Sequence, residues 1–482
     1  MNNSIVGFTI GILLLIIGVA DLIPAALDWY DGHLNYESFL YCSVVSVFFG
    51  GLLILSNIEA GSAAVSVRQT FLLTTLSWLS ISIFASFPLY FSDLKISFVD
   101  AFFESISGVT TTGSTILSGL DGMSRGVLLW RSIIQWIGGI GIIAFAIIIL
   151  PFLHMGSMNL FQTESSDRSD KVTPRTVVFV ILLMQVYVLL TALCALTYYL
   201  LGMSVFDAIN HALTTIPTGG YSTHDASFGY YKSPALQYAG ALFMLAGGVP
   251  FILYVKFLFR GRADFFQDSQ FKVLMMMLFV FIAFLTFWLW GRGEYGFFEA
   301  MRLSTFNIIS VITTTGFATT DYTLWGAFAV LFFFFITFLG ACTGSTAGGL
   351  KVSRLIVLMK VVNRQLKALC YPRGVFAMPY QGKFISNDIA MGTLGFLGLF
   401  VVSNTLLTIL LSLLGLDFAT AISGSATALA NVGPGIGDVI GPAGNFASLP
   451  DAAKLLLCAG MLLGRLEIMT VFVIFNRNYW LS

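Results

Sequence analysis

The stretch SGVTTTGSTIL, residues 107–117, places three consecutive threonines and a glycine inside a chain that is otherwise strongly apolar. Of the 482 residues, 57% are hydrophobic and only 10% are charged, and the mean hydropathy is +0.89. Ordinary soluble domains carry about 25% charged residues. The composition therefore predicts a polytopic membrane protein, in which such a polar stretch needs a function.

Three further stretches share this composition. With VTTTGST (109–115) they form the four Thr/Gly loops: TIPTGGYST (215–223), ITTTGFATT (312–320) and LANVGPGIG (429–437). Their expected central glycines are Gly113, Gly219, Gly316 and Gly433, which recur at near-regular intervals. Such a recurrence indicates a repeated structural unit.

Each Thr/Gly loop follows an apolar stretch that is too short to cross a membrane. These stretches are residues 98–107, 205–213, 297–311 and 417–430, and they begin near the acids Asp100, Asp207, Glu299 and Asp417. A carboxylate suits the positive end of a helix dipole. Because irregular backbone at membrane depth is tolerated only inside protein or beside a water-filled cavity, the stretches are predicted to be re-entrant half-helices.

Ten other apolar runs are long enough to cross about 30 Å of hydrocarbon, which takes roughly 20 helical residues. They cover residues 6–23, 38–55, 71–91, 127–153, 176–201, 234–258, 273–290, 323–339, 389–414 and 452–476. The first run lacks a small-residue cleavage site and is expected to be a retained span. Lys and Arg residues concentrate in the loops on the side of the N-terminus, so both chain ends are expected to be cytoplasmic.

The predicted fold is an all-α polytopic membrane protein with two leading transmembrane helices in residues 1–68. Four tandem span–pore helix–filter–span units follow around a pseudo-fourfold pore. They cover residues 69–155, 174–262, 271–373, with a broken second helix, and 384–482. A ring of backbone carbonyls that replaces the water shell of an ion is the construction of potassium filters. One Thr/Gly loop alone would be explained as a polar turn, whereas four in register favour a cation filter.

The loops, the four-unit repeat and the two leading spans resemble the Trk-type subunit of the Trk/Ktr/HKT superfamily of potassium-translocating proteins. The resemblance covers the whole chain, and NVGPGIG (431–437) is its most specific motif. It implies one potassium pathway per chain, with K⁺ as the transported ion and no cofactor. In plant relatives a serine in the first filter accompanies sodium transport, and this chain keeps Gly113. The implied filter residues are Thr111, Thr112, Gly113, Ile216, Thr218, Gly219, Thr314, Thr315, Gly316, Asn431, Val432 and Gly433.

The resemblance also implies partners and a location. Trk-type subunits form homodimers on a TrkA-like ring of cytosolic regulatory subunits that bind NAD or ATP, in the bacterial cytoplasmic (inner) membrane. Residues 362–387 form the longest inner loop and are rich in Lys and Arg. They are a natural docking surface for such a subunit, although simple positive-inside topology explains their charge equally well.

A second glycine-rich stretch, GACTGSTAGGLK, interrupts an apolar span at residues 340–351. A broken helix within a span needs a cavity beside it, and the resemblance places the family's intramembrane gating loop here; a plain helix kink is the alternative. The expected gate residues are Gly340, Thr343, Gly344, Ser345, Gly348 and Gly349. The stretch is not a phosphate loop, because Leu350 stands where the lysine is required.

Arg465 is the basic residue that the sequence buries most deeply in a span, at a cost of about 2.5–3.5 kcal/mol. Glu467 lies two residues later, on another face of the helix, so a local ion pair is not expected. The resemblance places an arginine of the fourth unit in the pore beneath the filter, as a barrier to cations. The alternative is a structural pair with a carboxylate on another span.

A secondary transporter that couples potassium to protons or sodium is the main alternative, although such folds usually repeat twice and often inverted. His211 and His224 flank the second loop and are expected to be polar residues of a half-helix and an outer vestibule rather than proton carriers. An enzyme is not expected, since the sequence lacks HExxH and GxSxG motifs. The zero net charge gives no basis for nucleic-acid binding.

Overall fold

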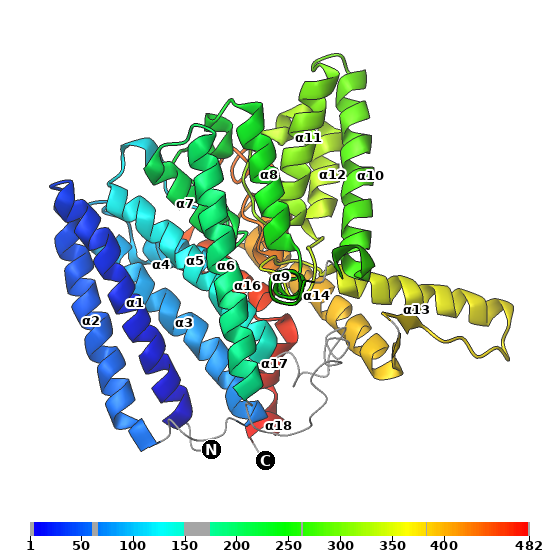
Figure 1. Cartoon of the computed structure of the whole chain (residues 1–482), viewed down its shortest axis with the longest axis horizontal. Coiled ribbons are helices and arrows are strands. Elements are labelled where there is room, and N and C mark those ends of the chain that lie inside the picture. Colours follow the sequence, from blue (N-terminus) through cyan, green and yellow to red (C-terminus); the bar gives the residue numbers. More distant parts are fainter. Residues whose placement is uncertain (1–3, 60–65, 149–173, 262–263, 382, 481–482) are drawn as a thin grey trace.

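The computed structural model describes residues 4–59, 66–148, 174–261, 264–381 and 383–480, and Figure 1 shows them as a bundle of helices. The helices are α1 (Ser4–Tyr30), α2 (Asn35–Ser56), α3 (Val67–Phe91), α4 (Phe98–Val109), α5 (Arg125–Ile148), α6 (Pro174–Leu200), α7 (Val205–Thr215), α8 (Pro234–Gly248), α9 (Phe251–Arg260), α10 (Ser269–Gly291), α11 (Phe297–Ile312), α12 (Ala327–Thr337), α13 (Val352–Cys370), α14 (Asn387–Leu413), α15 (Phe418–Ala430), α16 (Asp451–Arg465), α17 (Ile468–Phe475) and α18 (Arg477–Trp480). Short 3₁₀ helices are η2 (Leu120–Gly122), η6 (Ser227–Tyr230), η7 (Asp264–Gln267) and η8 (Tyr322–Trp325), and β1 (Pro379–Tyr380) pairs antiparallel with β2 (Lys383–Phe384). The all-α prediction is confirmed.

Within the described residues, six helices are long and apolar enough to cross a membrane, or eight if two bent pairs count as spans. The pairs are α8–α9, bent by 93°, and α16–α17, bent by 108°. Neither α5, which carries Arg125 and Arg131, nor α12, with 11 residues, enters this count. The ten-span topology and the unit boundaries stay predictions. Three of the basic residues that place the loops on the side of the N-terminus, Arg168, Lys171 and Arg262, lie outside the described residues, as does the expected end of the first unit at residue 155.

The four half-helices are present as α4, α7, α11 and α15. Ser97 and Ser204 cap α4 and α7, each accepting the backbone N–H of the acid three residues later, and Asp417 caps α15 by accepting from Thr420. The spacing from each acid to the glycine of its loop, which is longer in the third and fourth units, predicts that their half-helices are longer by about one turn. This holds for α11, with 16 residues, but α15 has 13 and α4 has 12.

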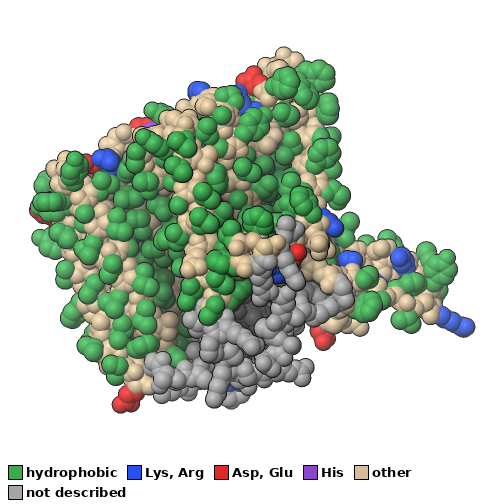
Figure 2. Space-filling model, viewed as in Figure 1, with side chains coloured by type: hydrophobic (Ala, Val, Ile, Leu, Met, Phe, Trp, Pro, Cys, Tyr) green, Lys and Arg blue, Asp and Glu red, His purple; other side chains and the backbone are tan. Residues whose placement is uncertain are grey.

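Apolar side chains cover the sides of the bundle, whereas charged side chains gather near its two ends and along α13 (Figure 2). The start of α1 and the short helix α18 lie at the same end of the molecule (Figure 1). The Tyr479 hydroxyl of α18 donates to the Arg68 carbonyl near the start of α3, at 2.7 Å. This distribution fits a chain whose helix sides face lipid.

The leading helices α1 and α2 form a hairpin beside the four units (Figure 1). Small residues allow the two backbones to approach closely, since an added Cβ on Gly11 would lie 2.8 Å from the Gly50 carbonyl. The hairpin is joined to the first unit by Asp28, whose carboxylate accepts the Gly126 N–H at 2.7 Å and so caps α5.

Asp21, two turns before Asp28 in α1, is fully buried, and neither carboxylate oxygen has a hydrogen-bond partner among the described residues. Replacing it by leucine is expected to stabilise the protein by about 1–3 kcal/mol, because the unsatisfied polar group is removed. The measurement is the thermal unfolding midpoint in detergent. Asp28→Leu is the matched control and should lower the midpoint, since α5 loses its cap; a lower midpoint for Asp21→Leu would show that this carboxyl has a partner.

Candidate filter and intramembrane gate

The four Thr/Gly loops share one backbone conformation. Each contains a non-glycine residue in the left-handed region, which is uncommon for such residues, and a left-handed glycine two positions later. The first set is Thr111, Thr218, Thr314 and Asn431, with φ of 52°, 57°, 57° and 56°; the second is Gly113, Gly220, Gly316 and Gly433, with φ of 86°, 78°, 81° and 109°. This shared pattern defines the structural register of the loops.

This register corrects the glycine that the sequence analysis predicted at the centre of the second loop. Gly220, rather than Gly219, is the counterpart of Gly113, whereas Gly219 stands at the position of Thr112. The backbone bonds agree, because the N–H groups of Gly220 and Gly316 both donate to the carbonyl six residues earlier, at 3.3 Å. The sequence could not separate the two neighbours, since either glycine can adopt a positive φ.

The left-handed glycines close a ring in chain order. A Cβ added to Gly113, Gly220, Gly316 or Gly433 would lie closer than 3.0 Å to a carbonyl oxygen of the next unit, namely that of Gly219, Thr315, Val432 and Thr112, respectively. The last contact returns from the fourth unit to the first. Each of these carbonyls belongs to the residue that precedes the left-handed glycine of its own loop. The four loops therefore form a closed pseudo-fourfold ring, and only glycine fits at its joints.

The side chains of the first left-handed set all lie against the break between α12 and α13 or against the end of α16. Arg465 Nη2 donates to the Thr111 hydroxyl at 2.5 Å, and the Thr218 hydroxyl donates to Thr346 Oγ1 at 3.4 Å. The Gly348 N–H donates to Thr314 Oγ1 at 2.7 Å, and an added Cβ on Gly348 would lie 3.1 Å from the Asn431 Cβ. The break between α12 and α13 and the end of α16 thus contact the ring at all four units.

The predicted break is confirmed, since α12 ends at Thr337 and α13 begins at Val352. The intervening segment, called the intramembrane loop, contains all six expected gate residues. Its ends meet, because the Gly340 N–H donates to the Leu350 carbonyl at 2.9 Å and the Leu350 N–H donates to the Phe338 carbonyl at 3.0 Å. A compact loop with adjoining ends can be displaced as a unit.

Contacts with α8, α9 and α10 pair several backbone groups of the intramembrane loop, and the Phe251 N–H of α9 donates to the Gly344 carbonyl at 2.9 Å. The Cys342 N–H donates to the Gly248 carbonyl at 3.1 Å, and the Thr343 N–H donates to Gln270 Oε1 at 2.9 Å. Thr346, which the sequence did not single out, donates from its hydroxyl to the Ile216 carbonyl at 2.8 Å. Neighbouring helices therefore pair part of this irregular backbone, as buried chain at membrane depth requires.

Arg465 ends α16 with a side chain that is only 6% exposed. Besides Thr111, its Nη2 donates to the Thr346 carbonyl at 2.7 Å, so it joins the ring to the intramembrane loop. Within the described part of the chain Arg465 forms no ion pair, so the alternative of a carboxylate on another span is not supported there; Glu467 pairs with Arg354. A cavity of about 40 Å³ lies at this point, lined by Arg465, Glu467, Arg354 and the intramembrane loop.

A side chain of each half-helix also forms a hydrogen bond with the segment that follows its own Thr/Gly loop. Glu104 accepts the Ile116 N–H at 2.9 Å, Asn307 accepts that of Thr319 at 3.3 Å, and Ser423 accepts that of Ile436 at 3.0 Å. In the second unit, His211 of the half-helix α7 bonds the Ser222 hydroxyl through Nε2 at 3.0 Å.

The His224 ring bonds Asp121 at 2.5 Å and stacks on Tyr230 at 3.6 Å between centroids. This hydrogen bond lowers the pKa of the Asp121 carboxyl. Asp121 follows the first loop and His224 follows the second, so the pair joins the outer segments of two units. The vestibular position expected for His224 fits these contacts.

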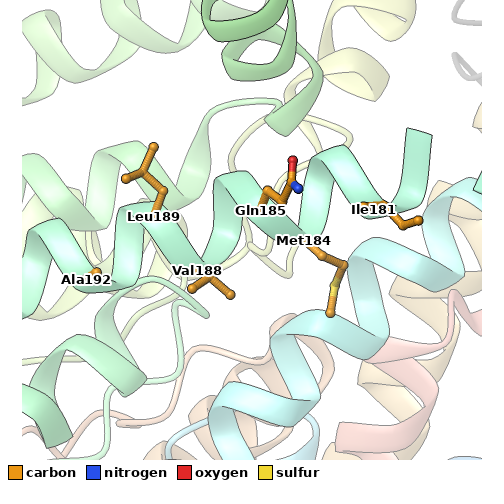
Figure 3. Close-up of a pocket in the computed structure, with 6 residues that line it drawn as sticks. All are labelled: Ile181, Met184, Gln185, Val188, Leu189 and Ala192. Atoms are coloured by element: carbon orange, nitrogen blue, oxygen red, sulfur yellow. The ribbon is translucent and has the colours of Figure 1, made fainter. Parts of the chain in front are cut away.

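A larger open groove, of about 530 Å³, runs along α6 (Figure 3). Ile181, Met184, Val188, Leu189 and Ala192 line it together with the single polar residue Gln185. It contains no titratable side chain and none of the ring residues. We assign it to the lipid-facing surface, and the site remains the ring and the parts beneath it.

A helical membrane protein in which four half-helices converge on a glycine ring, with a loop packed against that ring, has the construction of an ion-transporting membrane protein. Residues 37–481 match the TrkH family, described as a cation transport protein. The chain is 51% identical over 413 residues to the Trk system potassium uptake protein TrkI of Halomonas elongata, covering 86% of this chain and 84% of the relative. It is 34% identical to the Trk system potassium uptake protein TrkH of Escherichia coli, with 98% of each chain covered.

The crystal structure of the potassium transporter TrkH from Vibrio parahaemolyticus superposes with a TM-score of 0.93 at 32% identity, over 100% of both chains. The chain belongs to the TrkH family of cation transport proteins. These relatives are transport proteins, which agrees with the expectation that the chain is not an enzyme.

Proposed function

We propose that the chain takes up potassium through the ring of four Thr/Gly loops. The closed contact between each left-handed glycine and a carbonyl of the next unit carries this proposal, because it brings four equivalent backbone segments around one axis. Carbonyls at such an axis replace the hydration shell of K⁺. The half-helices end at the ring, so their negative ends favour a cation there. K⁺ is the transported ion and binds at the ring.

The intramembrane loop is the gate of this pathway, with Arg465 as a fixed positive charge beneath the filter. The contacts with Thr111, Thr218, Thr314 and Asn431 support a closed arrangement of ring, loop and arginine. Opening requires that these contacts break together. The intramembrane loop has the means to move, since Gly344 and Gly349 are left-handed glycines that can change φ at low cost.

A cytosolic partner that binds NAD or ATP regulates the chain. Two chains form a homodimer in the bacterial inner membrane, and both ends of each chain are cytoplasmic. The supporting observation is α13, which follows the intramembrane loop directly and projects sideways from the bundle (Figure 1). With the β1–β2 hairpin it presents the basic residues Lys360, Arg364, Lys367 and Arg373. A partner that moves α13 pulls on the gate.

The test is rubidium-86 uptake into liposomes that contain the purified chain and are loaded with potassium chloride, so that potassium efflux through the chain itself sets the membrane potential without an added ionophore. Uptake should follow the potential and be blocked by external potassium at far lower concentration than by sodium. Uptake that instead requires a proton or sodium gradient would establish the coupled transporter, and the ring would then be a binding site rather than a conduit.

A further inference from the structure

Helix α5 of the first unit reaches into the Thr/Gly loop of the second. The Gln135 side-chain amide donates to the Gly219 carbonyl at 2.8 Å, and its Oε1 accepts the Tyr221 N–H at 3.1 Å. These two backbone groups flank the left-handed Gly220. Gln135 is fully buried, so no water competes for either bond. One side chain therefore holds the backbone on both sides of Gly220. The Gly219 carbonyl that it binds is also the one that lies against Gly113.

One turn earlier in α5, Arg131 extends the same attachment outward. Its Nη1 donates to the Ser222 carbonyl at 3.0 Å, and its guanidinium lies 4.2 Å from the centre of the Tyr221 ring. A buried ion pair with Glu104, at 2.8 Å, holds Arg131 in place. Glu104 also accepts the Ile116 N–H in the segment that follows the first loop. The outer parts of the first and second loops are thus bonded to one pair of charges.

This attachment breaks the pseudo-fourfold symmetry. Gly138, Gly247 and Gly464 are equivalent positions in the second helices of units one, two and four. An added Cβ on each would lie closer than 3.0 Å to a carbonyl oxygen of its own unit, that of Val109, Ile216 and Leu429, respectively. Each of these carbonyls lies two residues before the left-handed Thr or Asn of its loop. Three residues before these glycines stand Gln135, Met244 and Met461. The amide is present in the first unit, and thioethers occupy the same position in the other two.

The second loop has a particular need for this amide. It alone among the four Thr/Gly loops contains two consecutive glycines, Gly219 and Gly220. Glycine pairs have the greatest backbone freedom, so the Gly219 carbonyl could rotate away from the ring at little cost. The other three loops carry Thr112, Thr315 and Val432 at this position, and β-branched side chains restrict the backbone.

We propose that Gln135 is a positioning residue for the filter: its bonds to Gly219 and Tyr221 hold the second loop in ring geometry and set the preference for potassium over sodium. The inference rests on the proposed function, since it assumes that the ring discriminates between cations. Discrimination by carbonyls depends on how many of them face the ion and how firmly they are held. A loose Gly219 carbonyl lets the ring contract around the smaller sodium ion.

The experiment compares Gln135→Met with Gln237→Met in the rubidium uptake assay, with potassium and sodium as competitors. Gln237 is a matched control, because it is a buried glutamine of α8 whose amide donates to the Tyr231 carbonyl at 2.9 Å, within the outer segment of its own unit. Gln135→Met should lower the ratio of sodium to potassium half-inhibitory concentrations by about tenfold, since two hydrogen bonds are lost. Gln237→Met should leave the ratio unchanged.

A folded Gln135→Met protein whose ratio stays within about twofold of the native value would overturn the inference. Should the methionine variant fail to fold, Gln135→Asn decides, because it keeps the amide but withdraws it by one methylene; a native ratio in that variant also counts against the inference. A native chain with no potassium preference refutes the proposed function itself, so the two failures are distinguishable.

Discussion

Gly113→Ser is expected to reduce the preference for potassium over sodium by at least about tenfold in rubidium uptake. Gly113 has a φ of 86°, and a Cβ built on it would overlap the Gly219 carbonyl oxygen. A side chain in the left-handed region costs about 1–2 kcal/mol by itself. The overlap adds to this, because the carbonyl must move out of the ring before the serine fits. The first and second loops are therefore both displaced at the joint where they meet.

Gly119→Ser is the control for this prediction. Gly119 lies six residues further along the same segment and is also left-handed, with a φ of 77°, but an added Cβ there has no atom within 4 Å. It should carry the backbone strain without disturbing the ring, so the ion preference should stay native while the unfolding midpoint falls. If Gly113→Ser keeps the native preference while uptake persists, the glycine ring does not discriminate between ions, and the filter assignment is wrong.

The repeat, the half-helices and the break before α13 could be predicted from the sequence because each has a local signature. Short apolar stretches end in threonine and glycine, and Gly340 to Gly349 interrupt a phenylalanine-rich span. The acid at the start of a half-helix follows from local sequence too, as at Asp417, which caps α15. These features depend on residues near one another in the chain, which is why composition and spacing were sufficient for them.

The register of the second loop could not be predicted in this way. Gly219 and Gly220 are chemically identical, and the choice between them depends on Thr315 of the third unit and Gln135 of the first, both distant in sequence. Gln135 itself gave a weak signal, as a polar side chain within an apolar span. Thr346 gave none beyond its place in a glycine-rich stretch. Contacts across units determine these roles, and a single sequence does not contain them.

The environment of Arg465 was predicted in part. Its depth in a span indicated a specific role, and its separation from Glu467 excluded a local pair. The structure gives it two oxygen partners instead, the Thr111 hydroxyl and the Thr346 carbonyl. Both are neutral, so its positive charge is not cancelled by them. A buried charge that keeps its field raises the energy of any cation that passes nearby.

Arg465→Met is therefore expected to increase rubidium uptake by at least about tenfold at a fixed membrane potential. Two effects act in the same direction. A unit charge about 6 Å from a passing cation costs it about 3 kcal/mol at an effective dielectric constant of about 20. Removal of Arg465 also releases the Thr346 carbonyl, and with it one attachment of the intramembrane loop to the first Thr/Gly loop. The change in uptake rate is measured with rubidium-86 in liposomes that contain the purified chain, per amount of protein.

Arg465→Lys separates the charge from the hydrogen bonds. Lysine keeps the positive charge but cannot reach Thr111 and Thr346 in the same planar arrangement. If the charge is the barrier, uptake by the lysine variant stays near the native level while the methionine variant is fast. If the attachment of the intramembrane loop is the barrier, both variants are fast. Native uptake in both variants would mean that Arg465 restrains neither the ion nor the intramembrane loop, and the pathway would have to avoid the space between Arg465 and the ring.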